Sequence, residues 1–277
     1  MKPLLIIPPA PARWPALRDL LADEGDVRLA DLERRIAHGL PGAQDAYAVI
    51  LSGGLCLSVA GISKHGDLGV LGPVYTRPDH RRRGYARQVT ETVLSWFEMT
   101  GGKWLYLTTT DELDEGLYWK FGFAQMHRAE WAPHNRLMML RVTHGVTSEP
   151  LADATGPVTV RDVTRVEWPA MVALLQYRPG PDPRVPLAES AVTAEAFTLD
   201  LLSHQDKGSC QLKAAFCGPR LTALASLAVD QPGSRTYAML IPHSDGPPEL
   251  RDAILELARS RGYTQVDFPM ETLVRPS

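Results

Sequence analysis

Five arginines and one histidine occur within "VYTRPDHRRRGYARQV" (74–89), in a chain whose formal net charge is −3. Gly84 and the small Ala86 follow three consecutive arginines, and helical periodicity begins directly after them. The first amides of a helix have no partner within the helix, and the helix dipole makes that end positive. Glycine lets an anion approach those amides, and arginines can hold it from the side. The pattern is therefore typical of a phosphate site at a helix start.

Nucleic-acid binding through "HRRRGYAR" is an alternative use of the same residues. A nucleic-acid-binding domain is usually basic, whereas this chain has 29 Lys and Arg against 32 Asp and Glu. The arginine run is therefore a local feature, and we expect no nucleic-acid partner.

The run before the arginines, "LGVLGPVYT" (68–76), reads as a strand with a proline inside it. Pro73 has no N–H for a sheet ladder and is tolerated at an edge or a bulge. Gly72–Pro73 therefore predicts that this strand parts from its neighbour in mid-course. An extended ligand could pair with the freed backbone groups, as in strand addition. An open strand beside a pyrophosphate site suits coenzyme A.

With these features the sequence resembles the GNAT superfamily of N-acyltransferases, whose cofactor loop reads R/Q-x-x-G-x-G/A. "RRRGYA" (81–86) is similar to that loop, and "LYWKFGF" (117–123) is similar to the family's L-Y-x-x-x-G-F element. The resemblance covers residues 1–142. It implies that backbone groups of one strand bind the pantetheine arm and thioester, and that amides of the loop bind the pyrophosphate. The strand residues are Val74, Tyr75 and Thr76, and the loop residues are Arg81, Arg82, Arg83, Gly84, Tyr85 and Ala86.

The resemblance makes Tyr118 the general acid for the leaving thiolate. A phenol with a pKa near 10 keeps its proton at pH 7 and can release it to a comparable base. The alternative for Tyr118 is an aromatic side chain packed on a short helix. Asp111 stands where many relatives have an asparagine that contacts the cofactor, and the alternative is a helix N-cap.

The general base is not assigned. Asp67 and His65 lie in a turn before the strand, where we expect them to be too distant. His127 and Glu130 follow Tyr118, and a surface pair is an equally good explanation of them. A water chain or an acceptor of low pKa would remove the need for a base.

The elements that must position these residues follow from the periodicity of the chain. They predict an α/β fold: a mixed, mostly antiparallel sheet flanked by helices, with one strand–helix–strand crossover. The expected strands are 3–7, 46–52, 54–63, 68–76, 103–110, 123–131 and 137–142. The expected helices are 12–23, 27–38, 85–99 and 112–121.

The second half echoes the first. "PARWPALRDLL" (11–21) and "RVEWPAMVALL" (165–175) share W-P-A-x-x-x-L-L, and 93–107 corresponds to 254–268. We expect a tandem protein: a GNAT acetyl-CoA-binding catalytic domain (1–142), a linker (143–157) and a degenerate GNAT-like domain (158–277). Its loop carries Asp245, Pro247 and Pro248 in place of the arginines. Proline offers a phosphate no N–H and aspartate repels it.

The function expected from all of this is N-acetyl transfer from acetyl-CoA to an amine, with a small molecule favoured. The alternative is a non-catalytic acyl-CoA sensor or scaffold. Three cysteines without C-x-x-C spacing, no signal-peptide pattern and no long apolar run predict a cytoplasmic protein without metal or membrane partner. A homodimer is possible from the habit of the family.

Overall fold

The computed structural model describes residues 1–109, 112–129, 136–147, 156–177, 194–229, 235–241 and 247–267. Two compact units, Met1–Thr147 and Ser148–Ser277, make up the chain. Each unit is described by itself. The boundary between them falls within the segment that the sequence predicts as a linker, and the roles expected of the two halves stay predictions.

The described part of unit 1 contains a seven-stranded sheet in the order β1-β2-β3-β4-β5-β7-β6. Its neighbours pair antiparallel except β4 and β5, which are parallel and are joined by the crossover helix α3. The predicted α/β class with a mixed, mostly antiparallel sheet is therefore confirmed. The strands are β1 (Leu4–Ile6), β2 (Gln44–Ser52), β3 (Leu55–His65), β4 (Leu68–Thr76), β5 (Trp104–Thr109), β6 (Phe123–Ala129) and β7 (Arg136–Val142).

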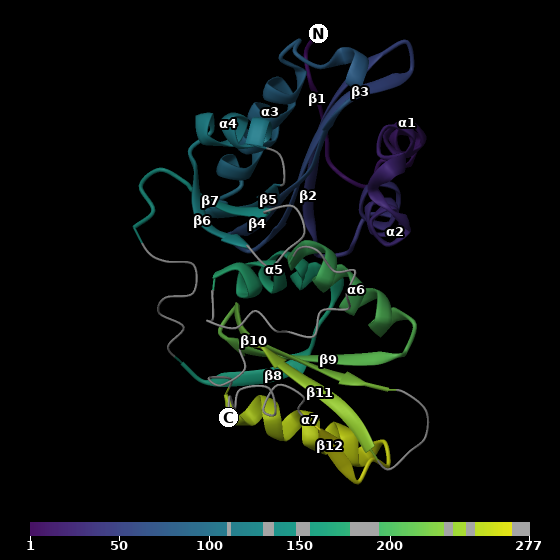
Figure 1. The fold of residues 1–277 in the computed structure, drawn as a ribbon, viewed down its shortest axis with the longest axis vertical. Coiled ribbons are helices and arrows are strands. Elements are labelled where there is room, and N and C mark those ends of the chain that lie inside the picture. Colours follow the sequence, from purple (N-terminus) through teal and green to yellow (C-terminus); the bar gives the residue numbers. More distant parts are fainter. Residues whose placement is uncertain are drawn as a thin grey trace. The chain divides into compact units, whose positions relative to one another are not determined.

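Helices cover both faces of this sheet (Figure 1). α3 (Tyr85–Met99) and α4 (Glu112–Lys120) lie on one face, where Val89, Val93 and Phe97 are buried against alternate residues of the strands. α1 (Trp14–Leu20) and α2 (Asp26–Glu33) lie on the other face. Because successive strand residues point to opposite faces, each strand contributes one set of side chains to each core.

The first two helices are less regular than their periodicity predicts. The expected helix 12–23 consists of η1 (Pro11–Arg13), α1 and η2 (Ala22–Glu24), and the expected helix 27–38 ends in the π-helix η3 (Arg34–His38). Gly25 and Gly39 have φ of 79° and 71°, a left-handed conformation that suits glycine and ends a helix.

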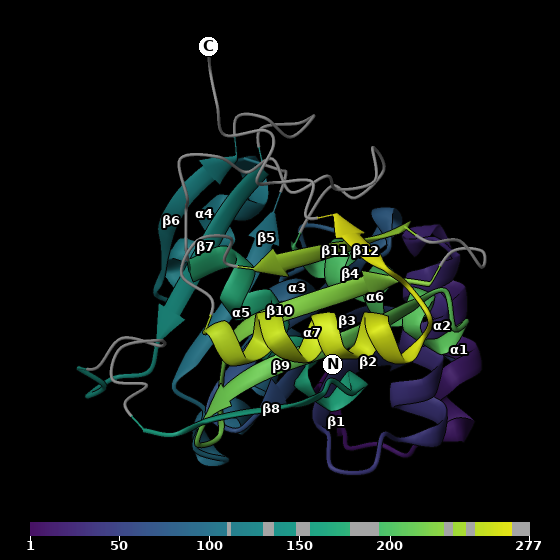
Figure 2. The same cartoon turned by 90° about the horizontal axis from the view of Figure 1, so that it is seen from below.

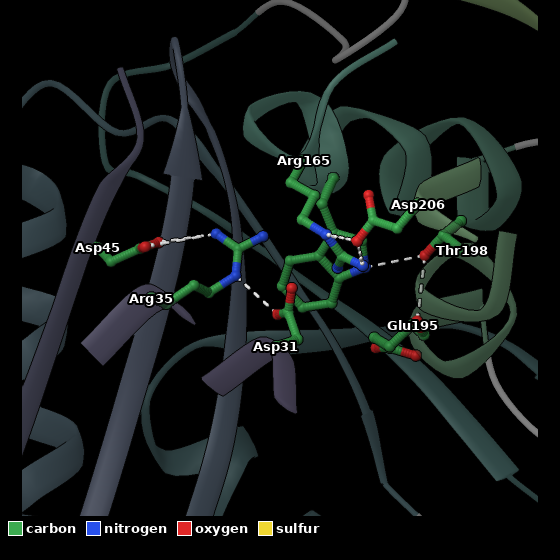
Figure 3. Close-up of polar contacts among 8 residues, drawn as sticks. Asp31, Arg35, Asp45, Arg165, Glu195, Thr198 and Asp206 are labelled. Carbon is green, nitrogen blue, oxygen red and sulfur yellow. Dashed lines mark hydrogen bonds and ion pairs between the residues drawn. The ribbon is translucent and has the colours of Figure 1, made fainter. Parts of the chain in front are cut away.

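A buried ion network joins α2, η3 and β2 (Figure 3). Nε of Arg35 donates to Oδ2 of Asp31 at 2.8 Å, and Nη1 donates to Oδ1 of Asp45 at 3.2 Å. Arg35 is 1% exposed, Asp31 1% and Asp45 5%. Burial opposes the charge of Arg35, but the two carboxylates outweigh it and hold its pKa above the ordinary value. The network therefore fixes the helical segment 26–38 against the start of β2.

The described part of unit 2 contains the sheet β8-β9-β10-β11-β12. The helices α5 (Trp168–Tyr177) and α6 (Ala194–Asp206) lie on one face, and α7 (Pro248–Ser260) crosses the other (Figures 1 and 2). The strands are β8 (Val158–Asp162), β9 (Cys210–Cys217), β10 (Arg220–Ala228), β11 (Arg235–Ile241) and β12 (Gln265–Asp267).

Two polar contacts within unit 2 tie α6 to the segment before and at the start of α5 (Figure 3). Nε1 of Trp168 donates to Oγ1 of Thr198 at 2.9 Å, and Arg165 and Asp206 form an ion pair at 2.8 Å. The indole N–H is thus satisfied without water, and the charge of Arg165 is paired.

The strands β8 to β12 of unit 2 are neighbours in chain order, as β1 to β5 are in unit 1. The first four strands of unit 2 pair antiparallel, and β11 and β12 are parallel and joined by α7, as β4 and β5 are by α3. This is the order expected of a duplicated unit, although the duplication itself stays a prediction. α7 begins at Pro248, which has no N–H, and Asp245 lies outside the described residues. No described helix of either unit is long and apolar enough to span a bilayer.

Removing the charge of Arg35 is expected to destabilise unit 1. Arg35→Met removes the buried cation that Asp31 and Asp45 share, which costs roughly 3–5 kcal/mol. Arg87→Met is the matched control, because Arg87 forms an exposed i,i+4 pair with Glu91 and its loss costs less than about 0.5 kcal/mol. Urea unfolding followed by circular dichroism measures both. Equal unfolding midpoints of the two variants would contradict a charged, buried network.

Candidate functional site

β4 leaves β5 at its centre. The two strands pair over Leu68–Val70 and no farther within the described ladder, whereas β5 continues to Thr109 beside β7. On its other side β4 has a bulge against β3: Ala60 pairs with Val74 and Ile62 with Leu71, so Gly72 and Pro73 face the single residue Gly61. The prediction that Gly72–Pro73 makes the strand part from its neighbour is confirmed.

The parting leaves an open edge of β4 at Val74–Thr76. The amide of Arg77 donates to the carbonyl of Leu57 on β3. Because the polar groups of successive strand residues alternate in direction, those of Tyr75 face β3 and those of Val74 and Thr76 face away from it. Oγ of Ser58 also donates to the Tyr75 carbonyl, at 3.2 Å. Of the three strand residues expected to bind the pantetheine arm, Val74 and Thr76 are therefore the ones with outward-facing backbone.

The loop after β4 ends at the start of α3, where the sequence predicts a helix. Arg82 has φ of 61° and the N-cap residue Gly84 has φ of 75°, both left-handed. Left-handed residues next to right-handed ones turn successive N–H groups toward one side, which makes an anion-binding concavity. Gly84 has no side chain that could cap the helix, and within the described residues no acceptor binds the amides of Tyr85 and Ala86. The backbone geometry of an anion site is therefore present at the start of α3.

The predicted arginines differ in what they contact. Nε of Arg81 donates to the Thr76 carbonyl at 3.2 Å, and its guanidinium lies 5.9 Å from the centre of the Tyr75 ring. Arg83 reaches the carbonyl of Asp79 at 3.4 Å, and Arg82 is exposed. Arg81 thus links the loop to the open edge of β4, while Arg82 and Arg83 project their charge into solvent at the start of α3.

Tyr118 lies in the core between α4 and the sheet. It is 7% exposed and packs edge-to-face on Phe123, with the ring centres 5.8 Å apart. The same cluster includes Leu107 of β5 together with Val74 and Tyr85, which are partly buried. The structure therefore gathers one residue of the open edge, one of the loop and Tyr118 on one face of the sheet. A packing role and a catalytic role both fit this position.

None of the candidate bases is placed by the described residues at the open edge of β4 or beside Tyr118. Asp67 forms an ion pair with Lys103 at 3.2 Å and precedes β4, roughly 15 Å along the strand from the bulge. His65 pairs with Leu68 at the same end of the hairpin. Asp111 and Glu130 lie outside the described residues, and of His127 the structure describes the backbone alone.

Cysteine and metal chemistry find no support among the described residues. Burial raises the pKa of the Cys56 thiol to about 12, so that this cysteine, on β3 near the site, stays protonated at pH 7. No group of three or more His, Cys, Asp or Glu in the described ranges could hold a metal ion. The absence of a metal stays a prediction.

Two residues at the bulge escape the sequence patterns. Arg28 of α2 and Tyr47 of β2 lie on the α1–α2 face, where a Cβ on Gly72 would be 3.6 Å from Nη2 of Arg28 and a Cβ on Gly61 would be 2.6 Å from the Tyr47 ring. Gly61 within the apolar run "SVAGIS" was the available signal, because a glycine inside a strand indicates close approach of another group.

A cavity of about 390 Å³ opens elsewhere in unit 1. Residues that line it include Pro9, His38, Asp45, Trp96 and Thr100, so it lies at the end of α3 rather than at its start. None of the predicted site residues lines it.

Residues 50–132 match the family model described as FR47-like protein. This range contains β3, β4, the arginine loop, α3, β5 and Tyr118. No curated protein matches the chain.

Solved structures of similar fold cover about half of the chain. Escherichia coli ElaA is 16% identical over 50% of this chain and 98% of its own, with a TM-score of 0.41. The ribosomal-protein-S18-alanine N-acetyltransferase of Escherichia coli is 14% identical over 54% and 98%, with a TM-score of 0.43. An aminoglycoside 6′-N-acetyltransferase complexed with coenzyme A is 15% identical over 51% and 97%, with a TM-score of 0.41. These likenesses are too distant to assign a function.

Two glycine substitutions are expected to act in opposite directions. Gly84→Ala forces an L-residue into a left-handed conformation and destabilises the protein by about 1–2 kcal/mol; the nearest atom, Nε2 of Gln88, is 3.9 Å away, so steric overlap adds little. Gly116→Ala lies within α4 with open space around it, and stabilises by about 0.5–1 kcal/mol. Thermal unfolding compares the variants. A stabilised Gly84→Ala protein would show that the α3 start is not held as described.

Proposed function

We propose that this protein is a GNAT-type N-acyltransferase that transfers an acetyl group from acetyl-CoA to a small-molecule amine. One observation carries the proposal: an uncapped helix start with two left-handed residues lies directly after a strand whose edge is open. The first feature suits a pyrophosphate, and the second suits the extended arm that joins a pyrophosphate to a thiol. The FR47-like match over residues 50–132 covers both features.

The pyrophosphate would bind the amides at the start of α3. Phosphate oxygens accept hydrogen bonds from helix-start amides and are favoured by the helix dipole. Arg82 and Arg83 are exposed beside those amides and can add charge-assisted hydrogen bonds, while Arg81 braces the loop against Thr76. Ala86, in the first turn of α3, leaves space beside the anion.

The pantetheine arm would add to β4 as a short strand. Val74 and Thr76 offer backbone groups on the open edge, and Tyr75 stays bound to β3. The Thr76 carbonyl now accepts from Arg81, so the arm would compete with that guanidinium or bind the second lone pair.

Direct transfer balances with the groups on the chain. The amine nitrogen attacks the thioester carbonyl carbon, the C–N bond forms and the C–S bond breaks. The ammonium proton goes to solvent through an unassigned base, the thiolate takes the Tyr118 proton, and the Tyr118 phenolate regains a proton from solvent, which restores the enzyme. Tyr118, buried in the core cluster against which Val74 of β4 also packs, is the proposed acid. An acyl intermediate on the Cys56 sulfur is disfavoured, because burial keeps that thiol protonated.

A non-catalytic acyl-CoA sensor or scaffold is the alternative. It is favoured by the ion pair of Asp67 with Lys103 and by the packing of Tyr118 on Phe123, both of which suit purely structural roles. Such a protein would bind acetyl-CoA and release no coenzyme A in the presence of any amine. Residence in the cytoplasm and homodimer formation remain predictions.

The arginines of the loop are expected to matter for cofactor binding. Replacing Arg82 and Arg83 together by Gln removes two charges from the proposed pyrophosphate site, and the Kd for coenzyme A should rise at least tenfold, since each charge-assisted hydrogen bond contributes roughly 1.5–3 kcal/mol. Arg87→Gln is the control, because Arg87 is already paired with Glu91. Titration calorimetry at low and high salt measures the effect. No binding of coenzyme A to the wild-type protein would refute the proposed function.

Tyr118→Phe tests acid catalysis. The ring keeps its place against Phe123, so the melting temperature and the KM for acetyl-CoA should change little, while kcat falls about 100-fold with an alkyl amine acceptor. Thiol release measured over pH 6–9 provides the readout. An unchanged kcat would assign Tyr118 to packing alone.

A further inference from the structure

Three strands carry a row of residues across the α1–α2 face at the level of the β4 bulge. Tyr47 of β2 pairs with Gly61 of β3, and Gly61 faces the bulge at Gly72 and Pro73. A Cβ on Gly61 would lie 2.6 Å from two carbons of the Tyr47 ring. Gly61 is thus the residue that leaves room for the Tyr47 ring over β3.

Arg28 approaches the same place from α2. Its Nη2 is 3.6 Å from the position that a Cβ on Gly72 would take, and among the described residues no other atom comes within 4 Å of that position. Asp31 and Arg35 follow Arg28 on the same side of the helical segment, and their ion network with Asp45 fixes this segment to β2. The guanidinium of Arg28 is therefore held beside the bulge by a rigid support.

The Tyr47 hydroxyl completes the pair. Tyr47 is fully buried, and its hydroxyl has no hydrogen-bond partner in the described part of the protein. Such a group costs about 1–3 kcal/mol, so its presence at this point calls for a partner. Burial and the charge of Asp45 raise the pKa of Tyr47, while the charges of Arg35 and, to a smaller extent, Arg28 oppose the shift.

We infer that Arg28 and the Tyr47 hydroxyl bind an anionic group, a carboxylate or a phosphate, of the acceptor amine. The inference rests on the proposed function, in which the thioester lies along the open edge of β4 that begins at this bulge. A guanidinium has five N–H donors, so Arg28 can hold an anion and keep another contact. The network holds two carboxylates, Asp31 and Asp45, and one guanidinium, Arg35, and Arg28 is the described cation that lies within 4 Å of the Gly72 position.

The consequence is a substrate class. The acceptor is an amino acid or an amino phosphate, whose negative group lies close to the amine. Polycations such as polyamines would meet the charge of Arg28 and are excluded.

The experiment compares acceptors that differ in the anionic group. The twenty proteinogenic amino acids and O-phosphoethanolamine are each tested against the amine that lacks the carboxylate or phosphate, with spermidine as a polycation and thiol release as the readout. At least one anionic acceptor should exceed its neutral partner about tenfold or more in kcat/KM. Whether it is an amino acid or O-phosphoethanolamine distinguishes carboxylate from phosphate recognition.

Variants then assign the preference to the bulge. Arg28→Gln should raise the KM for the anionic acceptor about tenfold or more and leave the KM for acetyl-CoA unchanged. Tyr47→Phe should act on the same constant to a smaller extent. Arg18→Gln on α1 is the matched control, because Arg18 is exposed and its loss changes the net charge equally.

The outcomes separate this inference from the proposed function. Preference for spermidine, no acetylation of any anionic acceptor, or an Arg28→Gln protein with wild-type constants would overturn the inference, even if calorimetry shows that coenzyme A binds. If calorimetry detects no binding of coenzyme A to the wild-type protein, the proposed function is overturned instead.

Discussion

One backbone constraint organises unit 1: β4 cannot pair with both neighbours along its whole length. Pro73 has no N–H to donate, and together with Gly72 it occupies the place opposite one residue, Gly61. β4 therefore bulges against β3 and leaves β5 after Val70. The open edge, the loop at the start of α3 and the contacts of Arg28 and Tyr47 all lie where this departure occurs or directly beyond it.

Where β4 leaves β5, the two faces of the sheet present different chemical groups. On the α3–α4 face, the open edge meets an uncapped helix start and the cluster of Tyr118, which together offer amides and a phenol. On the α1–α2 face, Arg28 approaches the bulge from the helical segment fixed by the Arg35 network, and Tyr47 approaches it from β2. A donor substrate and an acceptor on opposite faces would meet at one point of β4, which is what a direct transfer requires.

Local patterns predicted the fold, the parting of β4 from β5 and the helix that follows the arginine loop. The alternation of the strands, the single crossover and the start of α3 at Tyr85 follow from periodicity and from Gly84, because these signals depend on near neighbours in sequence. The 3₁₀ turns at the ends of the first helix and the π-helix at Arg34–His38 were missed, since tertiary packing decides the geometry of a weak helix end. Arg28 and Tyr47 could not be predicted, because their meeting depends on the register of three strands and the placement of α2.

Because Tyr47 closely approaches Gly61, the side-chain size possible at one of these positions depends on the side chain at the other. The space above β3 holds either a ring from β2 or a side chain from β3, since an added Cβ would lie 2.6 Å from the ring carbons. A chain of this fold with a residue larger than glycine at position 61 must carry a side chain smaller than tyrosine at position 47. Such a chain then has no phenol at the bulge. The glycine is thus a sequence marker for homologues that can carry a tyrosine at this place on β2.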